Sequence, residues 1–149
     1  MNFSNPWDVE YGRSRKENLK LKQYFEENSG LAFTEFNTTQ GMEGNLRALD
    51  AILFPGLETG VYKSSGNYSE IEELIQENPV KLIEVHKLGF YGFGQLVGKE
   101  KLVKKYWNPK ETKKVLVTLS PEEYHPERNP DPLTREVFDE FDIEVFVPE

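Results

Sequence analysis

Apolar and polar residues follow one another along the chain in a pattern that predicts helices and strands in a definite order. Ser14 and Glu17 form the Ser-x-x-Glu pattern that caps the start of a helix, and apolar residues at helical spacing continue it to about Asn28. Alternating or continuous apolar runs then predict strands at 31–36, 46–54, 80–86, 114–119 and 143–147.

Three further segments have the features of helices. A second Ser-x-x-Glu pattern at Ser69 and Glu72 predicts a short helix that stops before Pro79, and further helices are predicted at 93–107 and 131–141. We expect an irregular arm at 1–13, loops at 37–45 and 120–132, and an irregular excursion at 57–68. The first three strands can form an antiparallel meander and the 93–107 helix can cross over to the fourth. The predicted fold is therefore a single α/β domain, 1–149, with a mixed sheet flanked by helices.

The 80–86 strand carries an acid among apolar residues. Side chains alternate between the two faces of a strand, so Glu84 shares a face with Leu82 and His86, opposite Ile83 and Val85. A buried carboxylate is costly unless it is paired or bound to a cation.

Asp50 in the 46–54 strand offers a second acid, so that a divalent metal could lie between the two carboxylates. Two simpler interpretations stay open. Glu84 could form a buried ion pair with a lysine of the 93–107 helix, and Asp50 could pair with Arg47 or cap a bend.

Composition narrows the possible functions. The chain has no cysteine and two histidines, which excludes disulfides, thiolate zinc sites and cysteine nucleophiles. No apolar run approaches the length of a membrane helix, and we expect a soluble cytoplasmic protein with no membrane partner. The net charge of −8 argues against charge-driven nucleic-acid binding over the whole surface. Four lysines of the 93–107 helix could still form a local basic patch, or they could simply form a solvated helix face. They are Lys99, Lys101, Lys104 and Lys105.

Three features follow one another along the chain: Asp50 in one predicted strand, Glu84-Val85-His86 in the next strand, and Gln95 early in the following helix. Together they resemble the PD-(D/E)xK nuclease superfamily, which has a restriction-endonuclease-like fold. The resemblance implies an α-β-β-β-α-β core over roughly 14–119 and hydrolysis of nucleic-acid phosphodiesters with Mg²⁺ or Mn²⁺. It implies Asp50, Glu84 and the Val85 carbonyl as metal ligands and His86 and Gln95 as further catalytic residues. Glu35 or Glu17 would be an accessory acid, and the four lysines named above would contact the nucleic acid.

The chain departs from the family pattern at position 86, where histidine replaces the lysine that orients the attacking water. His86 can act as a general base near neutral pH, and Lys63 or Lys99 is considered as a replacement lysine. Two rival interpretations follow. One is a non-catalytic member of the fold that binds or inhibits a protein partner; the other is an assembly protein with exposed aromatic residues at an oligomer face.

Overall fold

Six strands and four helices are formed by the residues that this computed structural model describes, which are 1–8, 14–39, 48–118 and 132–148. The elements, in chain order, are α1 (Arg15–Glu27), β1 (Gly30–Asn37), β2 (Ala48–Pro55), β3 (Gly60–Lys63), α2 (Tyr68–Glu77), β4 (Pro79–Val85), α3 (Phe90–Trp107), β5 (Glu111–Val117), α4 (Pro132–Glu140) and β6 (Ile143–Phe146).

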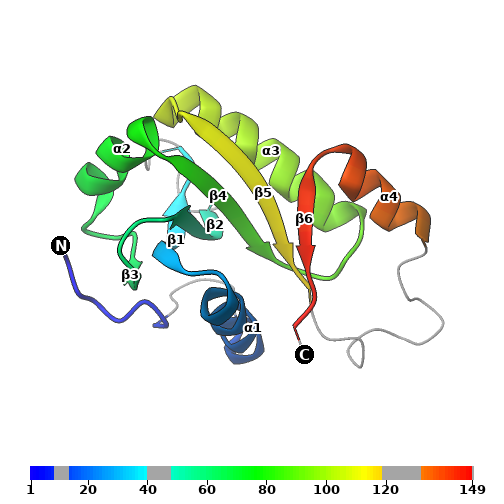
Figure 1. Cartoon of the computed structure of the whole chain (residues 1–149), viewed down its shortest axis with the longest axis horizontal. Coiled ribbons are helices and arrows are strands. Elements are labelled where there is room, and N and C mark those ends of the chain that lie inside the picture. Colours follow the sequence, from blue (N-terminus) through cyan, green and yellow to red (C-terminus); the bar gives the residue numbers. More distant parts are fainter. Residues whose placement is uncertain (9–13, 40–47, 119–131, 149) are drawn as a thin grey trace.

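All six strands form one mixed sheet in the order β3-β1-β2-β4-β5-β6 (Figure 1). The predicted antiparallel meander is confirmed, because β2 pairs antiparallel with both β1 and β4. β5 runs parallel to β4, with α3 as the crossover, and β6 runs parallel to β5. This arrangement confirms the predicted α/β fold class.

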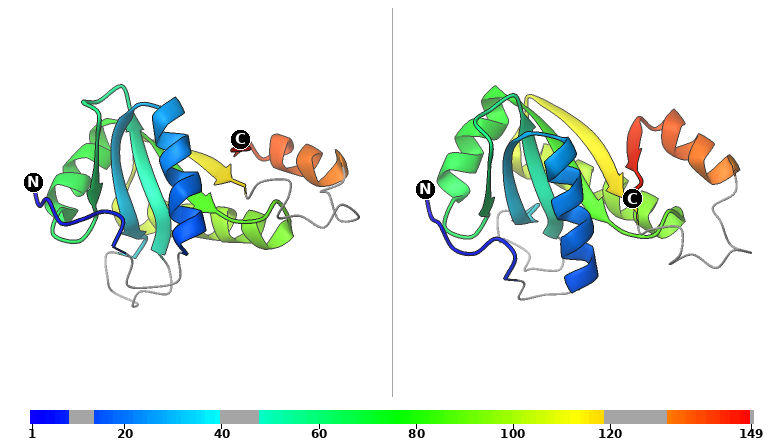
Figure 2. Two further views of the ribbon diagram at one scale, coloured as in Figure 1. Left: turned by 90° about the horizontal axis from the view of Figure 1, so that it is seen from below. Right: turned by 60° about the horizontal axis from the view of Figure 1, so that its bottom comes forward.

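The helices cover both faces of the sheet and create two separate cores (Figure 1). α1 lies on one face, where Leu21 and Tyr24 pack with Ile83 and Val85 of β4. α2, α3 and α4 lie on the other face, where Leu82 is buried with the apolar residues of these helices. The alternation predicted for the 80–86 strand is therefore present, and it directs Glu84 toward α3. Figure 2 shows α4 at the end of the sheet away from the N-terminus.

Trp107 fastens the end of α3 to the sheet. Its ring is buried, with its centroid 4.8 Å from the Phe36 ring and 5.8 Å from the Tyr68 ring. Its Nε1 donates a 3.3 Å hydrogen bond to the Asn37 carbonyl, so the indole is both packed and hydrogen-bonded.

The N-terminal arm packs against the rest of the chain as far as Asp8. Thr34 Oγ1 donates to the Pro6 carbonyl, and the Trp7 ring lies 6.2 Å from the Phe25 ring. The capping box of α1 is present, since Glu17 N donates to Ser14 Oγ and Ser14 N donates to Glu17.

Several predicted boundaries were wrong. The excursion at 57–68 contains β3, which pairs parallel with β1. α2 begins at Tyr68 after Asn67, so Ser69 does not cap it. α3 begins at Phe90, three residues earlier than predicted, because the buried Gly92 lets its first turn pack on Leu116 of β5. β4 ends at Val85, β5 begins at Glu111 and β6 ends at Phe146.

Some predictions fall on 9–13, 40–47, 119–131 and 149, which lie outside the described residues. They include most of the 37–45 and 120–132 loops, the first residue of the predicted 131–141 helix and the possible Asp50 partner Arg47. In the part of the chain that the structure describes, no helix is both long and apolar enough to cross a membrane.

Candidate functional site

Asp50 and Glu84 meet at the point where β2 and β4 run side by side. The register pairs Ala51 with Ile83, so the next pair along the two antiparallel strands is Asp50 with Glu84. Asp50 Oδ2 accepts a 2.8 Å hydrogen bond from the backbone N–H of Val85. The carboxyl groups themselves are close enough to hydrogen-bond to each other when one is protonated. The structure thus brings together the two acids on which the sequence prediction depends.

Lys99 of α3 is the third member of this cluster and reaches it from the sheet face that α3 covers. Its Nζ lies 2.7 Å from Glu84 Oε1 and donates a second hydrogen bond, 2.8 Å long, to the Ala48 carbonyl. The side chains of Lys99 and Glu84 are 11% and 10% exposed, so the ion pair is nearly shielded from water. This is the buried ion pair with a lysine of the 93–107 helix that the sequence left open.

The acid cluster changes the protonation of Glu84. Its pKa is raised from 4.5 to about 8, chiefly by burial and also by the neighbouring Asp50 carboxylate, whereas the Lys99 ammonium acts in the opposite direction. A raised pKa means that the Glu84 carboxyl group holds a proton more readily than an isolated glutamate does. A metal ion could take the place of that proton beside Asp50 and Glu84.

The β1–β2 ladder is interrupted beside Asp50. The paired residues run from Thr34–Ala51 to Phe36–Leu49 and omit Glu35 and Asp50. Glu35 has a φ of +52°, a left-handed conformation that is strained for a residue with a side chain. One of its carboxylate oxygens is buried without a hydrogen-bond partner, and the other lies 3.5 Å from Lys63 Nζ. Strained backbone and an unsatisfied acid next to the pair are features common at functional sites.

The other accessory acid lies elsewhere. Glu17 belongs to the capping box of α1, on the sheet face opposite Lys99. Val85, expected to supply a carbonyl ligand, donates its N–H to Asp50, and its side chain is buried on the α1 face.

His86 follows β4 and does not join the acids. Its backbone N–H donates to the Val117 carbonyl, and its Nδ1 lies 3.2 Å from the Lys87 carbonyl. Its ring stacks against Tyr91, with 4.9 Å between centroids and 36° between planes. No hydrogen bond joins it to Asp50 or Glu84, both of which are described.

Gln95 lies one helical turn before Lys99 on a neighbouring part of the α3 surface. Its side chain is half-buried, and the amide has no hydrogen-bond partner among the described residues. It is therefore available to a ligand that reaches the acids.

The remaining lysines of the predicted patch point outward. Lys101, Lys104 and Lys105 are exposed, Lys104 lies 3.6 Å from Glu100, and Lys105 lies over the Tyr106 ring. They form a surface separate from Lys99, which is buried.

The spacing of apolar residues in α3 contained a signal for the position of Lys99, but grouping Lys99 with the neighbouring lysines obscured it. The buried residues of α3 follow helical spacing at Gly92, Leu96, Lys99, Val103 and Trp107. Lys99 is the one charged residue of this stripe, and such a lysine must meet an acid or a carbonyl.

The donor set is compatible with a hard divalent ion. Asp50 and Glu84 supply carboxylate oxygens, and Mg²⁺ is held in many proteins by one or two carboxylates with water and substrate oxygens. Among the described residues there is no group of three or more acids or histidines that could hold a metal. A metal here would thus depend on these two acids and would compete with Lys99 for Glu84.

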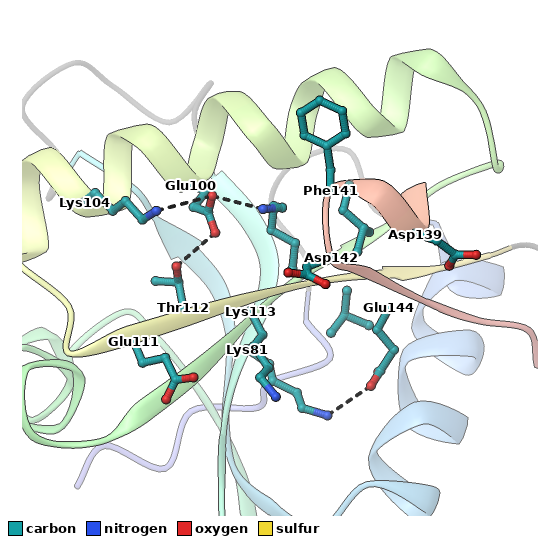
Figure 3. A pocket seen from close by; sticks show the side chains of 13 residues that line it. Lys81, Glu100, Lys104, Glu111, Thr112, Lys113, Asp139, Phe141, Asp142 and Glu144 are labelled. Atoms are coloured by element: carbon teal, nitrogen blue, oxygen red, sulfur yellow. Dashed lines mark hydrogen bonds and ion pairs between the residues drawn. The ribbon is translucent and has the colours of Figure 1, made fainter. Parts of the chain in front are cut away.

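A second polar feature lies at the other side of α3, between β5 and β6. It is an open hollow of about 650 Å³ in which some of the charged side chains pair with each other (Figure 3). Glu100 accepts from Thr112 at 2.9 Å and from Lys114 at 3.1 Å, and Lys81 lies 3.2 Å from Glu144. These bonds fasten α3 to β5 and β6 to β4, which gives the hollow a structural role.

No protein-family model matches the chain, and no match is found among curated proteins or solved structures.

Proposed function

We propose that the protein is a nuclease that hydrolyses phosphodiesters with a divalent metal held by Asp50 and Glu84 and with Lys99 as the lysine of the site. The observation that carries the proposal is the meeting of these three side chains, from β2, β4 and α3, at hydrogen-bonding distances. Lys99, one of the two replacement lysines considered from the sequence, would fill the role that His86 does not. Such an enzyme would act on nucleic acid in the cytoplasm.

The chemistry assigns a role to each residue. Mg²⁺ or Mn²⁺ bound here would polarise the phosphate and lower the pKa of a water molecule. Asp50 and Glu84 would hold that ion, and the N–H of Val85 keeps Asp50 oriented toward it. An ammonium has three N–H donors, and Lys99 uses two on Glu84 and Ala48. The third can donate to a phosphate oxygen and offset the negative charge that develops as water attacks. The free amide of Gln95 can hold the water or a second phosphate oxygen.

Calorimetric titration with Mn²⁺ tests the metal site directly. Wild-type protein should bind the ion, and Asp50→Asn and Glu84→Gln should each weaken binding strongly, whereas Glu73→Gln, an exposed acid of α2, should not. Unchanged binding in both site variants would remove the metal site. Cleavage of labelled DNA and RNA should then require Mn²⁺ or Mg²⁺ and be lost in Lys99→Met.

A second function is favoured by one specific observation: Lys99 is already satisfied by protein acceptors at 2.7 and 2.8 Å. In a non-catalytic protein-binding module, the only role of such an ion pair would be to fasten α3 to the sheet. In that case the wild type cleaves nothing and binds no Mn²⁺, and the double variant Glu84→Gln/Lys99→Met folds as stably as the wild type.

A further inference from the structure

Two large aromatic side chains stand exposed at the start of α3. Phe90 and Tyr91 are 66% and 67% exposed, and Lys87 just before them is exposed as well. Neighbouring exposed rings on a surface commonly mark a contact with a ligand or partner.

The Tyr91 ring is held in place beside the candidate site. It stacks on His86, whose own backbone is hydrogen-bonded to β5. His86 follows Glu84 by two residues, which corresponds to roughly 7 Å of extended chain. One face of the Tyr91 ring is thus fixed against protein close to the acids, while most of the side chain faces solvent.

A ridge of α3 connects this ring to the acids. Tyr91, Gln95 and Lys99 follow each other at intervals of four residues, and Lys99 lies about 12 Å along the helix axis from Tyr91. Tyr91 is exposed, Gln95 is half-buried and Lys99 is buried. A chain-like ligand lying on this ridge would touch the ring, then the free amide, then the cluster of Asp50, Glu84 and Lys99.

We propose that Phe90 and Tyr91 bind an unpaired base of single-stranded nucleic acid whose backbone follows this ridge to the acids. The proposal rests on the proposed nuclease function. Base stacking on exposed aromatic rings is a common basis of single-strand binding, and a duplex does not offer a free base face. Lys87, exposed just before the start of this ridge, supplies a positive charge that complements a phosphate backbone. A few nucleotides would separate the stacked base from the phosphate that is cut.

The test measures binding without cleavage. Fluorescence anisotropy in EDTA compares a labelled oligothymidylate, its oligouridylate counterpart and a blunt hairpin duplex. Wild-type protein should prefer the single strands, and Tyr91→Ala should weaken their binding roughly five- to 150-fold. Tyr91→Phe, which keeps the ring, should bind as the wild type does. Leu133→Ala removes an equally exposed side chain from α4 and serves as the control. Photocrosslinking with 5-iodouracil should attach the strand at Phe90 or Tyr91.

The results separate this proposal from the proposed function. Equal binding by Tyr91→Ala and Leu133→Ala, or equal affinity for duplex and single strand, overturns the stacking proposal even if Mn²⁺ binding and cleavage depend on Asp50 and Glu84. Loss of single-strand binding in Tyr91→Ala supports it even if Mn²⁺ binding proves independent of those acids, which would overturn only the nuclease.

Discussion

The ammonium of Lys99 lies 2.7 Å from the carboxylate of Glu84, joining the middle of α3 to the end of β4. Asp50 also neighbours Glu84 and raises its pKa, whereas Lys99 lowers it. These opposing influences on Glu84 have consequences for stability and for chemistry.

Removing the lysine should destabilise the fold. Lys99→Met leaves the buried Glu84 carboxyl group without its ammonium partner, and breaking a buried ion pair in this way costs about 3–5 kcal/mol. The loss should be smaller at pH 5 than at pH 8, because Glu84 can take up a proton. Urea unfolding at both values of pH provides the measurement. A second change, Glu84→Gln, should recover much of the lost stability, and failure to do so would indicate that the two side chains are not energetically coupled.

The raised pKa of Glu84 predicts a pH-dependent stability. The folded protein holds a proton that the unfolded chain releases, between the unfolded value of 4.5 and the folded value of about 8. The stabilising contribution of Glu84 is therefore complete below pH 4.5 and is lost as the pH rises through 8. Glu84→Gln should flatten the decline in unfolding free energy between pH 5 and 8. Glu73→Gln should leave it unchanged, and an equal decline in both variants would contradict the assignment.

Two glycines of α3 should respond differently to alanine. At Gly98 an added Cβ would meet nothing, so Gly98→Ala should stabilise the protein by roughly 0.5–1 kcal/mol through helix propensity. At Gly92 the Cβ would lie 3.2 Å from Leu116 Cδ1 and 3.4 Å from the Lys87 carbonyl. Gly92→Ala should therefore gain less or lose stability. Thermal unfolding of the two variants compares them directly, and a larger gain at Gly92 would contradict the packing.

Much of the sheet could be predicted because its strands carry strong local patterns. The runs around Asp50 and Glu84 are apolar and β-branched enough to identify two neighbouring strands, and the acids stand out within them. The position of Lys99 required one more step, namely the helical spacing of buried residues across a segment rich in exposed lysines.

Other features depended on tertiary contacts that no local pattern contains. β3 is four residues long and exists because β1 offers it a parallel edge. The start of α3 runs through glycines that disfavour helix, but Gly92 permits close packing on Leu116. His86 was expected beside Glu84 from strand alternation, yet β4 ends at Val85 and the ring turns to Tyr91.

The side-chain hydroxyl of Tyr24 joins α1 to β6, and Tyr24→Phe removes it while keeping the ring. The buried Tyr24 donates a 2.8 Å hydrogen bond to Glu144 Oε2, and burial together with Glu144 raises the pKa of Tyr24, so that it stays protonated at alkaline pH. Tyr24→Phe should lower the unfolding free energy by about 1 kcal/mol. Tyr91→Phe, at an exposed ring, should have no such effect, and equal stability of the two variants would show that the bond contributes nothing.

The two tryptophans lie on opposite sides of the sheet, so their fluorescence can report on each side. Trp107 is enclosed by Phe36 and Tyr68, so its emission should be shifted to short wavelength and change when α3 separates from β1. Trp7 is partly exposed, with Lys22 Nζ 4.9 Å from its ring centroid, so its emission should report release of the arm from α1. Replacing one tryptophan with phenylalanine would leave the fluorescence of the other, so that unfolding on each side of the sheet could be followed separately.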